Sequence, residues 1–393
     1  RAEIIRGAAA ETMPATTASL RTAVRQSLSP SKSFSGKASV LRGHRCVTLR
    51  GRCTAGRRRV VRVVAMVKVV VATELPSKGK SSLMEALSPS DVWFWPEKGG
   101  IPREELLERV KGCELLLVSL RERIDGELLD AAGPQLRALS TFSVGYDHID
   151  VAACRSRGIG VGNTPGVLTE TTADTAFALL MSTARRVPEA VDAVKNGEWR
   201  DWRPEWMCGK DVWGSTVGII GLGRIGLAFA RRVSGFGCEI VYSGRRRKPE
   251  AEEELLRRGC KSVRFVSQAE LVAESDFVVP MCELNDETRG MFCADLFRRM
   301  KSDAVLINIT RGAVVNQDDL YDALAGGVIG AAGLDVTVPE PLPPDHRLLT
   351  LPNCVVFPHI GSASVGTRQK MSELAAANIV AALNGEAMPY PVV

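Results

Sequence analysis

The sequence predicts an α/β protein built on parallel sheets, and three observations carry that prediction. Short apolar runs recur along the chain, and several are followed by segments with helical spacing, which is the pattern of an α/β sheet. One such run, at residues 217–220, leads directly into G-L-G-R-I-G at 221–226 and then into a helical stretch. With 393 residues, 45% of them hydrophobic, the chain can bury the cores of about two domains.

The glycine-rich turn indicates a dinucleotide site. Gly221 allows a tight turn, Gly223 lets the backbone approach a pyrophosphate, and Gly226 lets the helix pack closely on the strand. Arg224 and Ile225 would begin that helix, where unpaired N–H groups favour an anion. A purely structural glycine turn is the alternative, and the strand and helix on either side favour the dinucleotide.

Residues 1–65, here called the basic leader, differ from the rest of the chain. They hold 14 Lys and Arg against two acids, Glu3 and Glu11, which gives the leader a net charge of 14 − 2 = +12. Because the whole chain carries +6, the remainder carries 6 − 12 = −6. The basic balance therefore belongs to the leader and does not indicate a nucleic-acid partner. Its Arg- and Ser-rich, acid-poor composition is typical of an organelle transit peptide. A disordered basic tail is the alternative, and we expect no strand or helix there.

The leader predicts a location. Because Arg1 is no initiator, we expect translation to start at Met13, and residues 63–65 resemble a plastid processing site. A plastid is favoured, a mitochondrion is the alternative, and initiation at Met66 would give a cytoplasmic form. The C-terminus, 389–393, carries no S-K-L peroxisomal signal.

Composition argues against several other classes. The ten cysteines contain no C-x-x-C pair, so neither a metal site nor a disulfide scaffold is indicated, and we expect reduced thiols. No apolar run reaches the roughly 18 residues that span a bilayer, so no membrane partner is expected.

The first part of the chain is expected to form a sheet. Strands are predicted at 67–72, 113–118 and 136–141, with a turn-rich stretch at 89–102 and a helix at 103–111. The sequence S-V-G-Y-D-H at 143–148 follows the third strand, and N-T-P-G at 163–166 closes this part. A small residue and a glycine after a strand can expose consecutive N–H groups that bind a carboxylate, which singles out Val144 and Gly145. A plain tight turn is the alternative.

A predicted helix at 169–186 leads to an arm with four tryptophans within fifteen residues. They are Trp199, Trp202, Trp206 and Trp213. Since tryptophan is enriched at the centres of protein interfaces, we expect a dimerisation arm. A loop folded over its own domain is the alternative.

The second strand of the nucleotide fold, predicted at 238–243, indicates which cofactor binds. NAD sites usually carry an acid at the end of this strand for the ribose 2′-OH. Here Ser243 is followed by Gly244 and a basic cluster that includes Arg245 and Arg246, which suits a 2′-phosphate. NADPH is therefore preferred, with NADH possible. A solvated basic loop would explain the arginines but not the missing acid.

Four further strands are predicted at 277–280, 304–309, 331–336 and 354–357. Arg311, Glu340 and His359 follow the last three, at the sheet edge where ligands bind. An arginine can anchor a carboxylate, a histidine can protonate an alkoxide, and a paired glutamate would orient the histidine, which together suit reduction of a 2-oxo acid. Taken singly, each could be a surface arginine, a helix-capping glutamate or a core histidine.

Several motifs in this order give the chain its resemblance to a known family. They are S-V-G-x-D-H at 143–148, the glycine turn, N-I-T-R-G at 308–312, G-L-D-V at 333–336, E-P-L at 340–342 and H-I-G-S at 359–362. From about residue 67 to 389 the sequence resembles the D-isomer-specific 2-hydroxyacid dehydrogenases, especially the glyoxylate and hydroxypyruvate reductases. The resemblance implies two Rossmann-like domains, with an NAD(P)-binding domain at 168–363 inserted into a flavodoxin-like substrate-binding domain at 66–167 and 364–393. It also implies NADPH-dependent reduction of small 2-oxo acids, and homodimers.

The resemblance also implies roles for individual residues. Arg311, Glu340 and His359 take the catalytic positions. Val144, Gly145 and Ser362 would lie with Arg311 and His359 against the substrate. The cofactor would meet Gly221, Gly223, Arg224, Ile225, Gly226, Ser243, Arg245, Arg246, Ile309, Asp335 and Gly361. Asp335 would accept a hydrogen bond near Arg311 or the nicotinamide.

One departure and three alternatives stay open. Glu283 stands where close relatives tend to have a small polar residue near the cofactor, and its carboxylate would either repel a phosphate or point to solvent. Phosphoglycerate dehydrogenase is the neighbouring activity, although few residues follow His359. Relatives of formate dehydrogenase type carry Gln in place of Glu340. A non-catalytic NAD(H)-sensing scaffold, resembling transcriptional corepressors, is the alternative outside enzymes.

Overall fold

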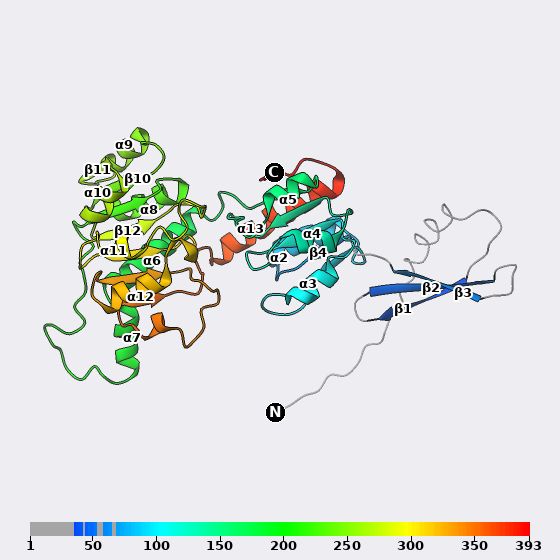
Figure 1. Ribbon diagram of the computed structural model, residues 1–393, viewed down its shortest axis with the longest axis horizontal. Helices are drawn as coiled ribbons and strands as arrows, with labels where there is room; N and C mark the ends of the chain where they lie inside the picture. The colour runs from blue at the N-terminus through cyan, green and yellow to red at the C-terminus, as the bar shows by residue number, and fades with distance from the viewer. Residues whose placement is uncertain (1–34, 42–43, 53–57, 65–67) are drawn as a thin grey trace, which may run out of the picture. The chain divides into compact units, whose positions relative to one another are not determined.

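The computed structural model describes residues 35–41, 44–52, 58–64 and 68–393, with side chains in the last range (Figure 1). The chain divides into two compact units, Arg1–Met66 and Val67–Val393. No helix in the described part of the chain is long and apolar enough to cross a membrane. The eight cysteines within residues 68–393 are all free, as expected.

The basic leader contains an antiparallel sheet of three strands in the order β1-β2-β3. The strands are β1 (Ser35–Leu41), β2 (His44–Arg52) and β3 (Arg58–Val64). We expected no strand here, and the expectation is wrong for these residues. Valines recur in all three strands, and β-branched residues favour extended backbone even in a basic segment. The targeting role stays a prediction, and Met13 and Met66 lie outside the described residues.

The first sheet of the second unit has five parallel strands in the order β5-β4-β6-β7-β8. They are β4 (Val69–Val71), β5 (Val92–Phe94), β6 (Leu115–Val118), β7 (Ala138–Thr141) and β8 (Gly160–Gly162). This is the flavodoxin-like strand order. The three predicted strands are present, each shorter than expected. Strands β5 and β8 were not predicted, since each has only three residues and β5 lies in the turn-rich stretch.

Helices from both ends of this unit cover the first sheet. They are α2 (Ser77–Ala86), α3 (Arg103–Arg109), α4 (Gly126–Ala132), α5 (Val151–Ser156) and, from the C-terminus, α13 (Val365–Asn384). Met371, Ala375 and Ile379 of α13 are buried against strands β4 and β6, in one core with Leu83 of α2. The C-terminal helix therefore completes a domain that the N-terminal part of the unit begins.

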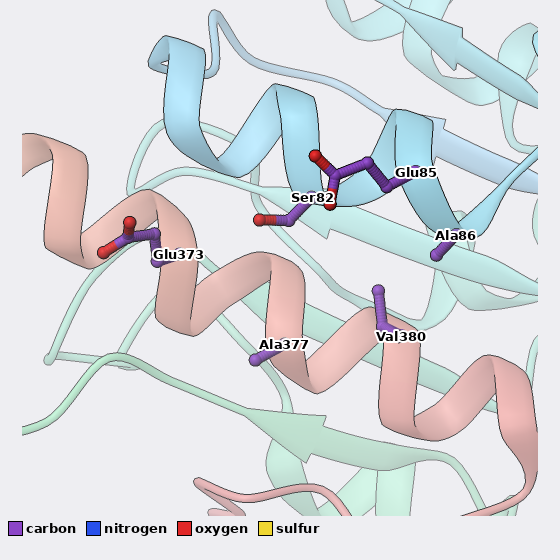
Figure 2. A pocket seen from close by; sticks show the side chains of 6 residues that line it. All are labelled: Ser82, Glu85, Ala86, Glu373, Ala377 and Val380. Atoms are coloured by element: carbon purple, nitrogen blue, oxygen red, sulfur yellow. The ribbon is translucent and has the colours of Figure 1, made fainter.

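Helices α2 and α13 lie side by side, as Figure 2 shows. Gly79 makes this approach possible, because a Cβ there would collide with the backbone of Ser372, whose hydroxyl accepts a hydrogen bond from the Gly79 N–H at 3.0 Å. A shallow groove follows the seam and includes none of the predicted site residues. Its lining is Ser82, Glu85, Ala86, Glu373, Ala377 and Val380.

The second sheet has seven parallel strands in the order β11-β10-β9-β12-β13-β14-β15. They are β9 (Thr216–Ile220), β10 (Glu239–Ser243), β11 (Ser262–Phe265), β12 (Phe277–Pro280), β13 (Val305–Asn308), β14 (Ala331–Leu334) and β15 (Cys354–Val356). The order reverses between β9 and β12, as in a Rossmann fold. Together the two sheets confirm the predicted fold class, and β11 was not predicted.

Helices cover both faces of the second sheet. They are α6 (Thr169–Ala184), α7 (Val187–Lys195), α8 (Arg224–Ser234), α9 (Pro249–Arg257), α10 (Gln268–Glu274), α11 (Ala294–Phe297) and α12 (Gln317–Ala325), with short 3₁₀ turns η1 (Gly312–Val314) and η2 (Arg347–Thr350). One core lies under α6 and α8 and another under α10 and α12, so the strands are buried on both faces.

Three of the four tryptophans of the arm are exposed, and Trp206 is half-buried. Trp199, Trp202 and Trp213 are 63%, 78% and 73% exposed. The adjoining helix α7 adds exposed apolar side chains at Val191 and Val194. The alternative of a loop packed on its own domain is therefore wrong for these three side chains.

Asn378 is a buried polar residue that connects α13 to the rest of the first domain. Its side-chain amide donates to Ser140 Oγ at 3.2 Å and to the Asn163 carbonyl at 3.0 Å, and its oxygen accepts from the Tyr390 N–H at 3.1 Å. One side chain thus connects a strand, a loop and the C-terminal segment.

We predict that Asn378→Ala lowers the free energy of unfolding by about 2–4 kcal/mol, because it leaves two backbone groups without partners. Denaturant unfolding of the full chain measures the loss. Asn384→Ala, at an exposed position of the same helix, is the matched control and should change stability by less than about 0.5 kcal/mol. Equal effects of the two substitutions would contradict the role assigned to Asn378.

Candidate active site

The glycine turn between β9 and α8 has the geometry that a dinucleotide site requires. Gly221 has a φ of +102°, and a Cβ on it would lie 2.9 Å from the carbonyl oxygen of Met281. A Cβ on Gly226 would collide with the Gly221 carbonyl, so the helix can start this close only at a glycine. A Cβ on Gly223 would meet nothing within 4 Å. That open space lies at the start of α8, which begins at Arg224, and it fits a pyrophosphate on the helix N-terminus.

The end of β10 presents two unpaired arginines. Ser243 is buried, and its carbonyl accepts from the Gly221 N–H at 2.9 Å, so this strand end lies against the glycine turn. Among the residues with described side chains, Arg245 and Arg246 are exposed and form no ion pair. Arg247 instead binds the buried Glu252 at 2.7 Å, and Glu252 also accepts from the Tyr242 hydroxyl at 2.6 Å. Arg245 and Arg246 are therefore the cations of this cluster that could meet a phosphate.

The loop after β7 leaves three consecutive N–H groups without an acceptor among residues 68–393. The carbonyls of Ser143, Val144 and Gly145 all accept hydrogen bonds, at 2.9, 2.8 and 2.6 Å. Since N–H and C=O point in opposite directions across a trans peptide bond, the N–H groups of the following residues point the other way. Within residues 68–393 none of these N–H groups has an acceptor. The donors to the three carbonyls are the Thr164 N–H, the Asn163 side-chain amide and the Ser143 hydroxyl, and the freed N–H groups are those of Val144, Gly145 and Tyr146.

A buried chain of hydrogen bonds supports this loop from behind. The Ser143 hydroxyl donates to Gly145 and lies 2.7 Å from Thr141 Oγ1, which lies 3.1 Å from His148 Nε2. Burial lowers the pKa of His148 to about 4, so the ring is neutral at physiological pH. A neutral ring with its proton on Nε2 donates to Thr141 Oγ1, whose hydroxyl then donates to Ser143 Oγ. The Ser143 hydroxyl donates in turn to the Gly145 carbonyl and holds it in place.

Arg311 reaches the same loop from the second sheet. It follows β13, where the Asn308 side chain donates to the Arg311 carbonyl at 2.9 Å. A Cβ on Gly145 would collide with Arg311 Nη2, so the guanidinium lies directly on that glycine. The guanidinium of Arg311 therefore lies beside the loop whose N–H groups are unpaired, and both kinds of donor suit a carboxylate.

His359 and Glu340 form a hydrogen-bonded pair, as predicted. His359 Nδ1 lies 2.7 Å from Glu340 Oε2, and Glu340 Oε1 accepts from the Thr337 N–H at 2.9 Å. Burial alone would raise the pKa of Glu340, but the hydrogen bond and the positive charge of His359 outweigh it and lower the pKa. The carboxylate holds Nδ1, which leaves Nε2 for a substrate.

The histidine sits in a strained backbone conformation. Its φ of +53° is in the left-handed region, which a residue with a side chain rarely adopts. Asp335, buried at the end of β14, accepts from the N–H groups of Ile360 and Gly361, both at 2.8 Å, and so holds the turn in place. Burial raises the pKa of Asp335.

Asp335 is a hydrogen-bond acceptor, as the resemblance implied, and its donors are backbone N–H groups of the histidine turn. These donors are close because β14 and β15 are neighbours and their ends lie together. Its expected place near Arg311 or the nicotinamide stays a prediction. A Cβ on Gly361 would lie 3.1 Å from Asp335 and 3.6 Å from Ile309, so the three residues predicted for the nicotinamide half are adjacent.

The remaining predicted positions are also described. Ser362 is half-buried in the turn after His359, beside Gly361, and Ile225 is half-buried in the first turn of α8. Glu283 is exposed, and its carbonyl accepts from Thr288 Oγ1 at 2.7 Å. Both alternatives for Glu283 stay open, because an exposed carboxylate can lie near a bound phosphate or point to solvent.

Three polar residues that orient the site were not predicted. Asn163 and Ser143 hold the loop carbonyls, and Asp147 accepts from Arg311 Nε at 2.8 Å. Asp147 and Ser143 stand inside the S-V-G-Y-D-H stretch, so the motif contained the signal. No sequence pattern indicates the contact between Asp147 and Arg311, which are 164 positions apart.

Comparison with known proteins identifies the family. Residues 177–361 match the NAD binding domain of the D-isomer specific 2-hydroxyacid dehydrogenases. The chain is 52% identical over 325 residues to mouse glyoxylate reductase/hydroxypyruvate reductase, which covers 82% of this chain and 97% of the mouse protein.

Solved structures agree with this identification. The TT0316 protein of Thermus thermophilus is 42% identical, with a TM-score of 0.75 over 83% of this chain and 99% of its own. An NADPH-dependent glyoxylate/hydroxypyruvate reductase of Sinorhizobium meliloti, in complex with NADP and malonate, is 32% identical, with a TM-score of 0.70 over 84% and 97%. With this fold, and with Arg311, Glu340 and His359 after neighbouring strands of one sheet, the chain belongs to the D-isomer specific 2-hydroxyacid dehydrogenases, a family of nicotinamide-dependent oxidoreductases.

Proposed function

We propose that the protein is an NADPH-preferring reductase that converts glyoxylate to glycolate and hydroxypyruvate to D-glycerate. The observation that carries the proposal is the meeting of Arg311 with the unpaired N–H groups of the 143–146 loop, together with the His359–Glu340 pair. The names of the mouse and Sinorhizobium relatives support the same substrates.

The residues of the chain suggest a division of labour. The N–H groups of Val144 and Gly145 and the guanidinium of Arg311 hold the substrate carboxylate. A bound nicotinamide supplies the hydride to the keto carbon. His359 donates the Nε2 proton to the keto oxygen, so the alkoxide never accumulates, and the ring ends neutral. The ionised carboxylate of Glu340 lies beside His359 Nδ1 and stabilises the charged ring until the Nε2 proton has been donated.

The cofactor preference rests on the arginines after β10. Arg245 and Arg246 have no carboxylate partner in the part of the chain with described side chains, and no acid stands at 243–248. A 2′-phosphate would supply the missing partner for these cations through charge-assisted hydrogen bonds. The NADP bound in the Sinorhizobium relative supports this choice.

The exposed tryptophans support a homodimer. Trp199, Trp202 and Trp213 are large apolar side chains that are exposed on the single chain, as are the valines of α7. Contact with a second copy would bury such side chains, and aromatic residues are the type that concentrates at interface centres.

The first prediction tests the reaction. The full chain should oxidise NADPH rapidly with glyoxylate and hydroxypyruvate, and slowly with pyruvate and 3-phosphohydroxypyruvate. His359→Gln should lower kcat by about 10²–10⁴-fold, since the proton donor is lost, and leave the Kd for NADPH unchanged. His346→Gln is the control, because His346 caps η2 through Leu348 and should leave kcat unaltered.

Other outcomes of this assay would select other functions. Fastest turnover of 3-phosphohydroxypyruvate would indicate phosphoglycerate dehydrogenase. Tight NADPH binding with no turnover of any substrate would indicate the sensing scaffold. Equal loss of turnover and NADPH affinity in His359→Gln would mean that His359 is structural.

The second prediction concerns the cofactor. Arg245→Asp should lower the ratio of kcat/KM with NADPH to kcat/KM with NADH by about tenfold or more, because a carboxylate repels the 2′-phosphate and can accept from a ribose hydroxyl. Arg257→Asp makes the same charge change on the exposed end of α9 and should leave the ratio unchanged. An unchanged ratio in Arg245→Asp would mean that the basic cluster does not set the cofactor preference.

The third prediction concerns assembly. Light scattering should give the mass of a dimer for the full chain, and Trp202→Asp should raise the dimer dissociation constant by about tenfold or more. Leu256→Asp is the control, since Leu256 is 48% exposed on α9, outside the arm. A monomeric wild type would contradict the proposed dimer.

A further inference from the structure

The two domains of the second unit are joined by an ion pair inside the candidate site. Arg311 Nε lies 2.8 Å from Asp147 Oδ1, and both side chains are half-buried, at 24% and 33% exposure. Asp147 belongs to the loop after β7 of the first sheet, and Arg311 to the turn after β13 of the second. Among ion pairs within residues 68–393, this one alone connects the two sheets and their helices.

The pair determines which edge of the guanidinium is available. Nε donates to Asp147, and Nη1 donates to the Thr310 carbonyl at 2.9 Å. The remaining nitrogen, Nη2, lies against Gly145, beside the unpaired N–H groups. Hydrogen bonds from two different nitrogens fix the plane of the guanidinium, so Nη2 is the nitrogen left to donate to a substrate carboxylate.

The charges around Asp147 keep its carboxylate ionised and paired with Arg311. Burial alone would raise the pKa of Asp147, but the charge and the hydrogen bond of Arg311 outweigh it and lower the pKa. The neighbouring His148 does not compete as a cation, because burial lowers its pKa to about 4. Asp147 therefore stays ionised above its lowered pKa, across the range in which the enzyme would act, and pairs with Arg311 there.

We propose that Asp147 is a positioning residue that holds the guanidinium of Arg311 over the 143–146 loop, so that donors from both domains meet on one substrate carboxylate. The proposal rests on the proposed function, since it assigns Arg311 to that carboxylate. Without Asp147 the long arginine side chain loses its contact with the first domain and spends part of its time away from Gly145. Substrate affinity should then fall, while the proton donor and the cofactor contacts are unchanged.

The test is a series at Asp147 in the full chain. Asp147→Ala should raise the KM for glyoxylate by about tenfold or more, with kcat at saturating glyoxylate within about threefold of wild type. Asp147→Asn keeps an acceptor oxygen without the charge and should give an intermediate KM. The Kd for NADPH should not change in either variant.

Equilibrium binding and a matched control separate positioning from damage to the fold. The Kd of oxamate, a non-reacting analogue of a small 2-oxo acid, should rise in parallel with KM in the presence of NADPH. Asp150→Ala removes the acid that caps α5 through the Ala153 N–H, three residues along the chain. That variant should lose stability without a change in oxamate affinity.

A double-mutant cycle tests whether Asp147 acts through Arg311. Lysine lacks the Nε–H that Arg311 donates to Asp147 and also lacks the planar guanidinium that this contact orients. In an Arg311→Lys background, Asp147→Ala should therefore have little further effect on oxamate affinity. An oxamate Kd within twofold of wild type in Asp147→Ala would overturn the proposal. So would the same fold-change in both backgrounds, because Asp147 would then act independently of Arg311.

The two proposals fail in different ways. A wild-type protein that reduces neither glyoxylate nor hydroxypyruvate would refute the proposed function. If wild type reduces either acid and Asp147→Ala matches it in KM and oxamate affinity, the proposed function stands and the role of Asp147 is refuted.

Discussion

The parallel arrangement of both sheets is the constraint on which the site depends. Chemical groups that follow parallel strands gather at one edge of the sheet, and here two such edges contribute to one site. The first supplies the 143–147 loop after β7, and the second supplies Arg311, Asp335 and His359 after β13, β14 and β15. The edges meet at Gly145, where any side chain would collide with Arg311. A glycine at that position is therefore part of the substrate site as well as of the turn.

Carboxylates set the geometry of the donors at this junction. Asp335 holds the turn that places His359 in the left-handed region, Glu340 fixes the imidazole ring, and Asp147 fixes the guanidinium. Each acid is itself supported by burial or by a backbone donor, so the donors are oriented before a substrate arrives. Donors that are already oriented need not move during the reaction, so they stabilise the charge of the transition state at little energetic cost.

Much of this architecture could be predicted from the sequence, and the exceptions have physical causes. Apolar runs such as 277–280 identify buried strands directly, and the glycine turn identifies the crossover to α8, because its chemistry is local. Strand β5 was missed since three residues among prolines and glycines carry no period. The His359–Glu340 pair was predicted because both residues follow strands of the same sheet. The contact of Asp147 with Arg311 joins two sheets, and no local pattern encodes such a meeting.

The C-terminal helix α13 has a consequence for the order in which the protein can fold during synthesis. Its buried face completes the core of the first sheet, and the Val392 N–H donates to the Val161 carbonyl at 2.7 Å, so the last residues extend that contact to β8. A ribosome makes β4 to β8 roughly 200 residues before it makes α13, and the whole nucleotide domain emerges in between. The nucleotide domain is therefore completely synthesised before the first domain is. The strands that bear the substrate loop have to wait, with one face only partly covered, until α13 has been made.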